Sequence, residues 1–216
     1  MKKFLSFIKI IRPLNVLSSG VAILFSSFIS DYQGPLEQIL MPILVVVFFT
    51  IGANILNDYF DYDTDKINRP DRSIVKGDIT REQALYLSLI SFIIGIYFAL
   101  RLSSDSQIIS LGISLPLLFL YNAKIKNYPL IGNIIVSIII GLSFIYAGVV
   151  FENVKPLIVP SLLAFGLTLI REVVKDIADF KGDEAIGART LPIVFGKQKA
   201  IYFCTILSIL LSMAAF

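Results

Sequence analysis

Two short segments of the chain carry aspartates at the same spacing, with steps of three and then four residues. These residues are Asp58, Asp61 and Asp65 in the first set and Asp176, Asp179 and Asp183 in the second. Carboxylates on one helix face repel each other and are costly to desolvate, so they need a compensating positive charge. Mg²⁺ prefers oxygen ligands and completes its shell with water and phosphate oxygens. Together with neighbouring Lys and Arg residues, the two sets predict a site for Mg²⁺ and a diphosphate.

The two aspartate sets indicate an internal repeat with an offset of 118 residues (176 minus 58). At about 100° per residue, each set falls within an arc of roughly 60° on a continuous helix. The arc includes the residue four positions earlier, Asn54 or Glu172, whereas Asp63 points the opposite way and is expected to be solvated. The repeat predicts one membrane domain, residues 1–216, built from pseudo-repeats of about 1–126 and 127–216, the second of them incomplete.

The composition excludes a soluble globular protein. Hydrophobic residues make up 56% of the 216 positions and charged residues only 16%, with a mean hydropathy of +0.81 and a formal charge of +3; soluble domains are about 25% charged. The chain has no His and a single cysteine, Cys204. An intrachain disulfide is therefore excluded, and a zinc site has almost none of its usual ligands available.

Seven apolar segments are long enough to cross a bilayer as helices, which predicts an all-α, polytopic transmembrane bundle. Their ranges are 14–30, 39–57, 83–100, 107–121, 130–150, 156–172 and 200–216. Seventeen of the nineteen Lys and Arg residues lie before the first segment or in the loops after the second, fourth and sixth segments, and the other two, Arg101 and Lys155, lie on the opposite side. The positive-inside rule places the N-terminus and both acidic segments on the cytoplasmic side of the cell membrane.

The first acidic segment, Asn57-Asp58-x-x-Asp61-x-x-x-Asp65, resembles the N-D-x-x-D-x-x-x-D signature of the UbiA superfamily of intramembrane prenyltransferases. The second resembles that superfamily's second aspartate-rich motif, and the resemblance runs from Arg12 to the end of the chain. It implies an all-helical membrane enzyme that uses Mg²⁺ and transfers a prenyl group from a polyprenyl diphosphate to an acceptor. Members usually have eight or nine spans, so this chain is expected to lack about two helices of a complete bundle.

The same resemblance implies roles for the motif residues. Each aspartate triad would hold one Mg²⁺, which gives two ions per site. Residues expected to support the metal ligands or contact the polar groups of the substrates are Asn54, Asn57, Arg12, Asn15, Tyr121 and Lys124.

Basic residues near the acidic segments are expected to pair with phosphate oxygens, since Lys and Arg form charge-assisted hydrogen bonds to them. Candidates for the diphosphate are Lys124, Lys66, Arg69 and Arg72, and candidates for a phosphorylated acceptor are Arg12, Arg72, Lys175 and Arg189. No residue is assigned as the base, because a carboxylate and the departing diphosphate are both able to take the acceptor's proton.

Two stretches narrow the resemblance within the superfamily. The stretches are residues 65–72 and residues 171–192. They are most similar to archaeal members that transfer a geranylgeranyl group from its diphosphate to the free hydroxyl of geranylgeranylglyceryl phosphate. That reaction forms the second ether bond of archaeal membrane lipids. The expected partners are these two lipid-like substrates and the surrounding membrane lipids; no nucleic acid and no obligatory protein partner is indicated.

Other functions are weighed against this one. An aromatic or quinone polyprenyltransferase of the same superfamily shares both acidic motifs. A cation transporter is more remote, because ion sites of transporters lie near the bilayer midplane whereas these acids lie at helix ends beside basic loops. The motif of CDP-alcohol phosphatidyl transferases begins Asp-Gly, and neither acidic segment fits it.

Overall fold

The chain is helical almost throughout, as the apolar pattern predicts. A computed structural model describes residues 2–125 and 128–214, with the side chains of all of these except 2–4, 124 and 214, and the described residues include no strand. Helices are the expected solution in lipid, because each helix satisfies its own backbone hydrogen bonds.

Seven groups of elements correspond to the seven predicted segments. In chain order they are α1 (Lys2–Ile11) with α2 (Pro13–Ile29); α3 (Leu36–Phe60); α5 (Arg81–Ala99); α6 (Ser104–Gln107), η1 (Ile108–Ser114), α7 (Leu115–Leu120) and η2 (Tyr121–Ile125); α8 (Ile131–Val150); η3 (Lys155–Leu157) with α9 (Ile158–Ala178); and α12 (Lys197–Ala214). Three short helices connect them: α4 (Tyr62–Asn68), α10 (Phe180–Ala185) and α11 (Leu191–Phe195).

Among the described residues, five helical segments are long and apolar enough to cross a membrane. A sixth is added if Leu5–Ile11 and Pro13–Ile29, which meet at an angle of 47°, count as one span. The chain is thus a multi-pass membrane protein. Helix α12 is outside this set, and residues 215–216 of the predicted seventh span lie outside the described residues. The total of seven spans stays a prediction.

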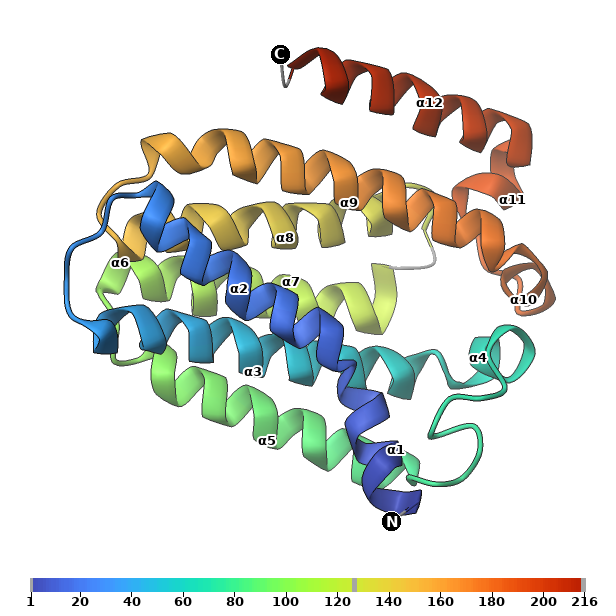
Figure 1. Cartoon of the computed structure of the whole chain (residues 1–216). Coiled ribbons are helices and arrows are strands. Elements are labelled where there is room, and N and C mark those ends of the chain that lie inside the picture. Colours follow the sequence, from blue (N-terminus) through green and yellow to red (C-terminus); the bar gives the residue numbers. More distant parts are fainter. Residues whose placement is uncertain (1, 126–127, 215–216) are drawn as a thin grey trace.

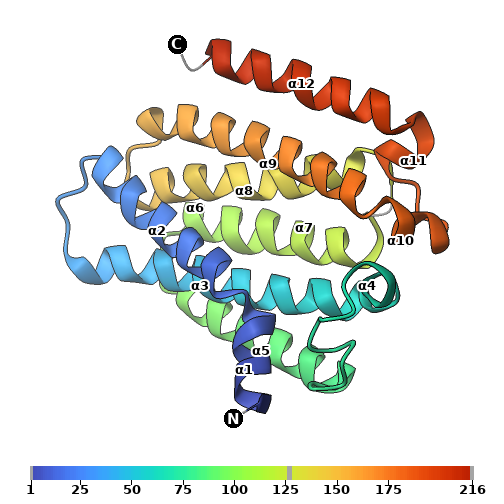
Figure 2. The ribbon, with the colours of Figure 1, turned by 45° about the vertical axis from the view of Figure 1, so that its right-hand side comes forward.

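The long helices run side by side, and the two short helices α4 and α10 meet at one end of the bundle (Figure 1; Figure 2). Helix α3 packs against α2 and α5, and α9 packs between α8 and α12. Glycine permits the close approach of α3 and α5, because a Cβ atom at Gly95 would lie 2.5 Å from the ring of Phe49. The bundle thereby brings the ends of α3 and α9, which carry the acidic segments, to the same end of the molecule.

Helix α1 is fastened to the loop that follows α4. Ser6 Oγ donates a hydrogen bond to Asp78 at 2.8 Å, Ser73 Oγ donates to the Ser6 carbonyl at 3.1 Å, and Lys9 Nζ donates to the Asp71 carbonyl at 3.0 Å. These bonds hold α1 across the end of the bundle where α4 lies (Figure 1).

Candidate functional site

Both acidic segments break at the middle aspartate of their set. Asp61 is the C-cap residue that follows α3, with φ −83° and ψ 6°, and Asp179 is the C-cap residue that follows α9, with φ −84° and ψ 4°. The prediction of one continuous helical stripe in each segment is therefore wrong, because Asp65 and Asp183 lie on the separate helices α4 and α10. Equivalent residues adopt nearly the same backbone conformation, so the sequence repeat is matched by a repeat in local structure.

Helical hydrogen bonding resumes at once after each break, which keeps the aspartates of a set at one end of the bundle. The amide of Asp65 donates to the Asp61 carbonyl at 2.7 Å, and the amide of Asp183 donates to the Asp179 carbonyl at 3.1 Å. The short helices α4 and α10 then turn toward each other (Figure 2).

A small pocket of about 50 Å³ lies between the two acidic segments. Its lining contains carboxylates from both: Asp61, Asp65, Asp176, Asp179 and Asp183. The remaining lining residues are Thr64, Arg69, Tyr121, Lys175 and Thr190. Five of the six predicted metal ligands therefore surround one space.

A much larger cavity of about 790 Å³ extends from this pocket into the bundle. Arg69, Tyr121 and Lys175 line both spaces, so the two are contiguous at these residues. The inner walls include apolar side chains such as Val45 and Ile139. The site thus combines a charged head region with a long, largely apolar chamber.

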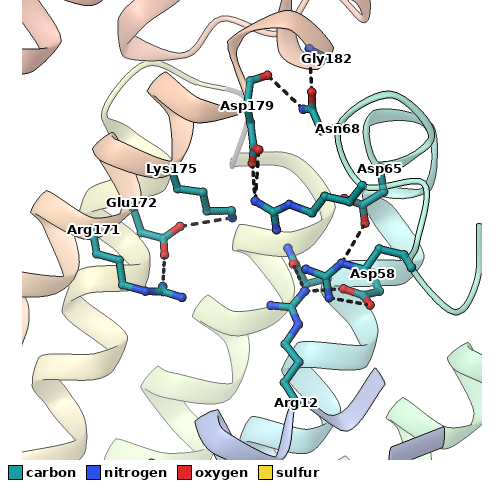
Figure 3. Close-up of polar contacts among 12 residues, drawn as sticks. Arg12, Asp58, Asp65, Asn68, Arg171, Glu172, Lys175, Asp179 and Gly182 are labelled. Carbon is teal, nitrogen blue, oxygen red and sulfur yellow. Dashed lines mark hydrogen bonds and ion pairs between the residues drawn. The ribbon is translucent and has the colours of Figure 1, made fainter. Parts of the chain in front are cut away.

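Asp58, the sixth predicted ligand, lines neither space and is engaged by two arginines. Its side chain is 2% exposed, Arg12 Nη2 donates to one carboxylate oxygen, and Arg72 Nη1 donates to the other at 3.3 Å. Arg12 Nη2 also donates to Asn57 Oδ1 at 3.1 Å. Figure 3 shows Arg12 reaching Asp58 from below the other charged side chains. Burial and the nearby Arg12 charge lower the pKa of Arg72.

Arg12 reaches this position because the chain bends at it. It is the residue between α1 and α2, with φ 58° and ψ 72°, and Pro13 begins α2. Left-handed conformation is uncommon for a residue with a Cβ atom. The Nδ2 atom of Asn54 donates to the Ile11 carbonyl at 2.9 Å and so fixes the end of α1 against α3.

Four hydrogen bonds join α4 and its following residue to the second acidic segment. Arg69 Nη2 donates to both carboxylate oxygens of Asp179, at 2.8 and 3.1 Å. Asn68 Nδ2 donates to the Asp179 carbonyl at 3.0 Å, and the amide of Gly182 donates to Asn68 Oδ1 at 3.1 Å (Figure 3). A Cβ atom at Gly182 would lie 2.3 Å from Asn68 Nδ2, so only glycine fits this contact.

The second acidic segment has further partners that the sequence did not reveal. Glu172 accepts from Arg171 at 2.5 Å and from Lys175 at 3.4 Å, and Asn133 Nδ2 donates to Asp176 at 2.9 Å. Asn133 is a polar residue at the start of an apolar run, which is the signal that would have suggested a role for it.

Burial raises the pKa of the Asp65 carboxyl to about 6. The nearby charge of Asp61 raises it further, whereas Arg72 opposes both effects. Asp65 therefore takes up a proton more readily than an exposed aspartate does.

The residues predicted to bind the substrates differ in where the structure places them. Those that line the large cavity are Arg12, Asn15, Asn54, Asn57, Arg69, Arg72, Tyr121 and Lys175. The structure does not bring Lys66 to the site, because its side chain is 48% exposed and pairs with the 73%-exposed Asp63, which is solvated as predicted. Lys124 follows in η2, but its side chain lies outside the described residues.

No three acidic or cysteine side chains lie close enough to hold a metal ion among residues 2–125 and 128–214. The carboxylates of Asp58 and Asp179 form ion pairs with arginine side chains, which neutralise their negative charge.

Comparison with known proteins adds a family and several relatives. A model of the UbiA prenyltransferase family matches residues 19–216. A protein of Pyrococcus horikoshii named digeranylgeranylglyceryl phosphate synthase is 37% identical over 213 residues, which cover 98% of this chain and 76% of the relative. A protein of the same name from Methanosphaera stadtmanae is 36% identical over 204 residues, covering 94% of this chain and 74% of the relative.

Solved structures show the same fold. One described as giving insights into digeranylgeranylglyceryl phosphate synthase in membranes has a TM-score of 0.79 and 33% identity, covering 99% of this chain and 76% of its own. A UbiA homologue from Archaeoglobus fulgidus bound to GPP and Mg²⁺ has a TM-score of 0.72 at 17% identity, covering 96% and 75%. The all-helical architecture predicted from the sequence is confirmed.

Proposed function

This chain belongs to the UbiA prenyltransferase family, and from that premise we propose that it transfers a geranylgeranyl group from geranylgeranyl diphosphate to the free hydroxyl of geranylgeranylglyceryl phosphate. The product is the doubly alkylated glyceryl phosphate of archaeal ether lipids. Relatives named digeranylgeranylglyceryl phosphate synthase, at 36–37% identity over nearly the whole chain, support this choice of substrates.

One observation carries the proposal: the carboxylate-lined pocket opens into the large cavity at Arg69, Tyr121 and Lys175. A prenyl diphosphate has a charged head and a long apolar tail. We assign the diphosphate to the small pocket and the tail to the cavity between the helices. The reacting carbon C1, which joins head to tail, then lies at the three shared residues.

Magnesium fits the head region. The donors around the small pocket are oxygens, the type that Mg²⁺ prefers, and Thr190 adds a hydroxyl that is unpartnered among the described residues although Thr190 is only 5% exposed. The A. fulgidus homologue bound to GPP and Mg²⁺ supports the same assignment. Asp58, Asp61 and Asp65 would hold one ion and Asp176, Asp179 and Asp183 a second. When bound, the ions supply positive charge that neutralises the leaving diphosphate.

The chain's own side chains bind and orient the substrates. Arg69 pairs with diphosphate oxygens at the junction, and Arg12 and Arg72 add positive charge from the first half. The C1–O bond to the diphosphate breaks with its electron pair leaving on the diphosphate. The acceptor oxygen bonds to C1 and its proton passes to the released diphosphate, while the apolar wall of the cavity keeps water from C1.

The phosphate of the acceptor requires positive charge at the cavity. Arg12, Arg72 and Lys175 line the cavity and provide it, as does Arg171, which the sequence did not single out for this role. Arg189, a further candidate from the sequence, is exposed and lines neither space. Arg12, Arg72 and Lys175 are our candidates for binding the acceptor phosphate.

Product mass tests the proposal. Membranes or purified protein are incubated with geranylgeranyl diphosphate, Mg²⁺ and either geranylgeranylglyceryl phosphate or an aromatic acid. We expect a digeranylgeranyl product from the first acceptor only, loss of turnover with EDTA, and recovery with added Mg²⁺. Product from the aromatic acid alone would replace the proposal with an aromatic prenyltransferase.

A further inference from the structure

Asn122 presents a buried oxygen to the cavity without a hydrogen-bond donor. The residue is 2% exposed, lies in the π-helical turn η2, and lines the large cavity next to Tyr121. Its Nδ2 atom donates to the Leu118 carbonyl at 2.8 Å. Its Oδ1 atom has no donor within the part of the chain that the structure describes.

The orientation of the Asn122 amide follows from its one hydrogen bond. Exchanging the nitrogen and oxygen positions would place Oδ1 against the carbonyl oxygen of Leu118, where two acceptors repel. The nitrogen is therefore committed to Leu118, and the oxygen is the free end. Leaving a buried acceptor unpaired is unfavourable, and such groups are rare enough in folded proteins to need an explanation.

The position of Asn122 places this oxygen near the reacting centre. Its neighbour Tyr121 is one of the three residues at which the small pocket meets the cavity. π-Helical turns within helical segments occur frequently at functional sites. Here the turn at 121–125 supplies two consecutive side chains, Tyr121 and Asn122, to the cavity wall.

We infer that Asn122 Oδ1 accepts a hydrogen bond from the hydroxyl of the alcohol acceptor and so holds that oxygen toward C1. The inference rests on the proposed function. An ionised diphosphate offers acceptors but no donor, and a prenyl chain offers neither. Of the two substrates, the alcohol is the one whose reacting group is an O–H donor, so it complements a free amide oxygen.

This contact positions the nucleophile without removing its proton. An amide oxygen is a hydrogen-bond acceptor but does not titrate near neutral pH. As the acceptor oxygen bonds to C1 and the C1–O bond to the diphosphate breaks, the proton passes to the released diphosphate. Asn122 is thus an acceptor-binding residue and not the base.

Equilibrium binding with a matched pair of ligands tests this role. The pair is geranylgeranylglyceryl phosphate and its analogue in which hydrogen replaces the free hydroxyl, measured on the full chain with Mg²⁺ and inorganic diphosphate. In the wild type we expect the hydroxyl to strengthen binding about 2- to 13-fold, the range of one neutral hydrogen bond. In Asn122→Leu, which keeps the size but removes the acceptor, the two ligands should bind equally.

Two variants separate this role from a structural one. Ser143 also lines the cavity, but its hydroxyl already donates to the Ile140 carbonyl at 2.6 Å, so Ser143→Ala should retain the wild-type ratio. Asn122→Thr should recover part of the ratio, because a helical Thr hydroxyl donates to the carbonyl four residues earlier and still accepts.

The outcomes distinguish this inference from the proposed function. A wild-type ratio retained in Asn122→Leu overturns the inference, as does weaker binding of both ligands by the same factor. Wild-type protein that forms no product from the two lipid substrates overturns the proposed function itself, whatever the binding ratio.

Discussion

Asp65 is a titrating group at the edge of the site, outside the membrane-spanning segments. Burial and the charge of Asp61 raise its pKa to about 6, so the folded protein favours the protonated form. Its stabilising contribution is full below the unfolded pKa of about 4 and is lost as the pH rises through about 6. In EDTA, wild type should therefore lose melting temperature relative to Asp65→Asn between pH 4 and 6, and the difference should be constant above that. A difference that does not change with pH would contradict this.

Asp176 tests the metal assignment better than Asp58 does. Removing Asp58 leaves Arg12 and Arg72 without their buried partner, whereas Asp176 has the neutral partner Asn133. Asp176→Ala should reduce transfer more than about 100-fold, because a ligand of the charge-neutralising metal is lost. The measurement is product formation at saturating substrates.

Asp63 supplies the matched control for Asp176. It lies within the first acidic segment, but its side chain is 73% exposed and pairs with Lys66 away from the pocket. Asp63→Ala should retain wild-type turnover and melting temperature. Equal losses in Asp63→Ala and Asp176→Ala would mean that the total negative charge matters, and the assigned geometry would fail.

At the scale of elements, the contact between α4 and α10 sets the distance between the acidic segments. Gly182→Ala should break the two hydrogen bonds of Asn68, since the added Cβ would lie 2.3 Å from Nδ2 of Asn68. We expect transfer to fall about 10-fold, as misplaced reacting groups are costly. Gly112→Ala is the control, because nothing lies within 4 Å of a Cβ atom there.

A double variant identifies the clash as the cause. Once Asn68→Ala has removed the obstructing side chain, adding Gly182→Ala should have little further effect on transfer. Neighbouring residues that act through one contact are expected to be non-additive in this way. Additive losses would show that Gly182 acts through something other than Asn68.

The sequence predicted the helices but not how they end. Apolar runs and the 118-residue offset indicated the long helices and the repeat, since burial in lipid leaves a strong compositional pattern. Regular spacing, however, also predicted unbroken helices through Asp61 and Asp179, where the chain instead turns into α4 and α10. The spacing of aspartates is compatible with both shapes, because helical hydrogen bonds resume directly after each turn.

Which arginine pairs with which aspartate also could not be predicted from the sequence. Local spacing shows which side chains share a helix face, but Arg12 and Asp58 are 46 residues apart and Arg69 and Asp179 are 110 apart. Which cation meets which carboxylate depends on how the helices pack. For the same reason Lys66, close in sequence to the acidic residues, pairs outward with Asp63.

At the scale of the whole molecule, the distribution of Lys and Arg predicts that the site faces the cytoplasm. Cys204 is the single cysteine, so Cys204→Ala allows labelling at chosen positions. Gln33→Cys, in the loop at 31–35, should react with a membrane-impermeant maleimide on intact cells, and Lys181→Cys should react only after lysis. Both positions are exposed. The reverse pattern would invert the assigned orientation.

The bonds that fasten α1 to the loop after α4 have a practical consequence for handling the protein. Because Arg12 reaches Asp58 directly from the end of that fastened helix, a force on α1 is transmitted to the charged head region. A bulky affinity tag fused close before Lys2, or deletion of 2–11, should disturb substrate binding before it disturbs the packing of the long helices. Purification handles are better separated from α1 by a long, flexible linker.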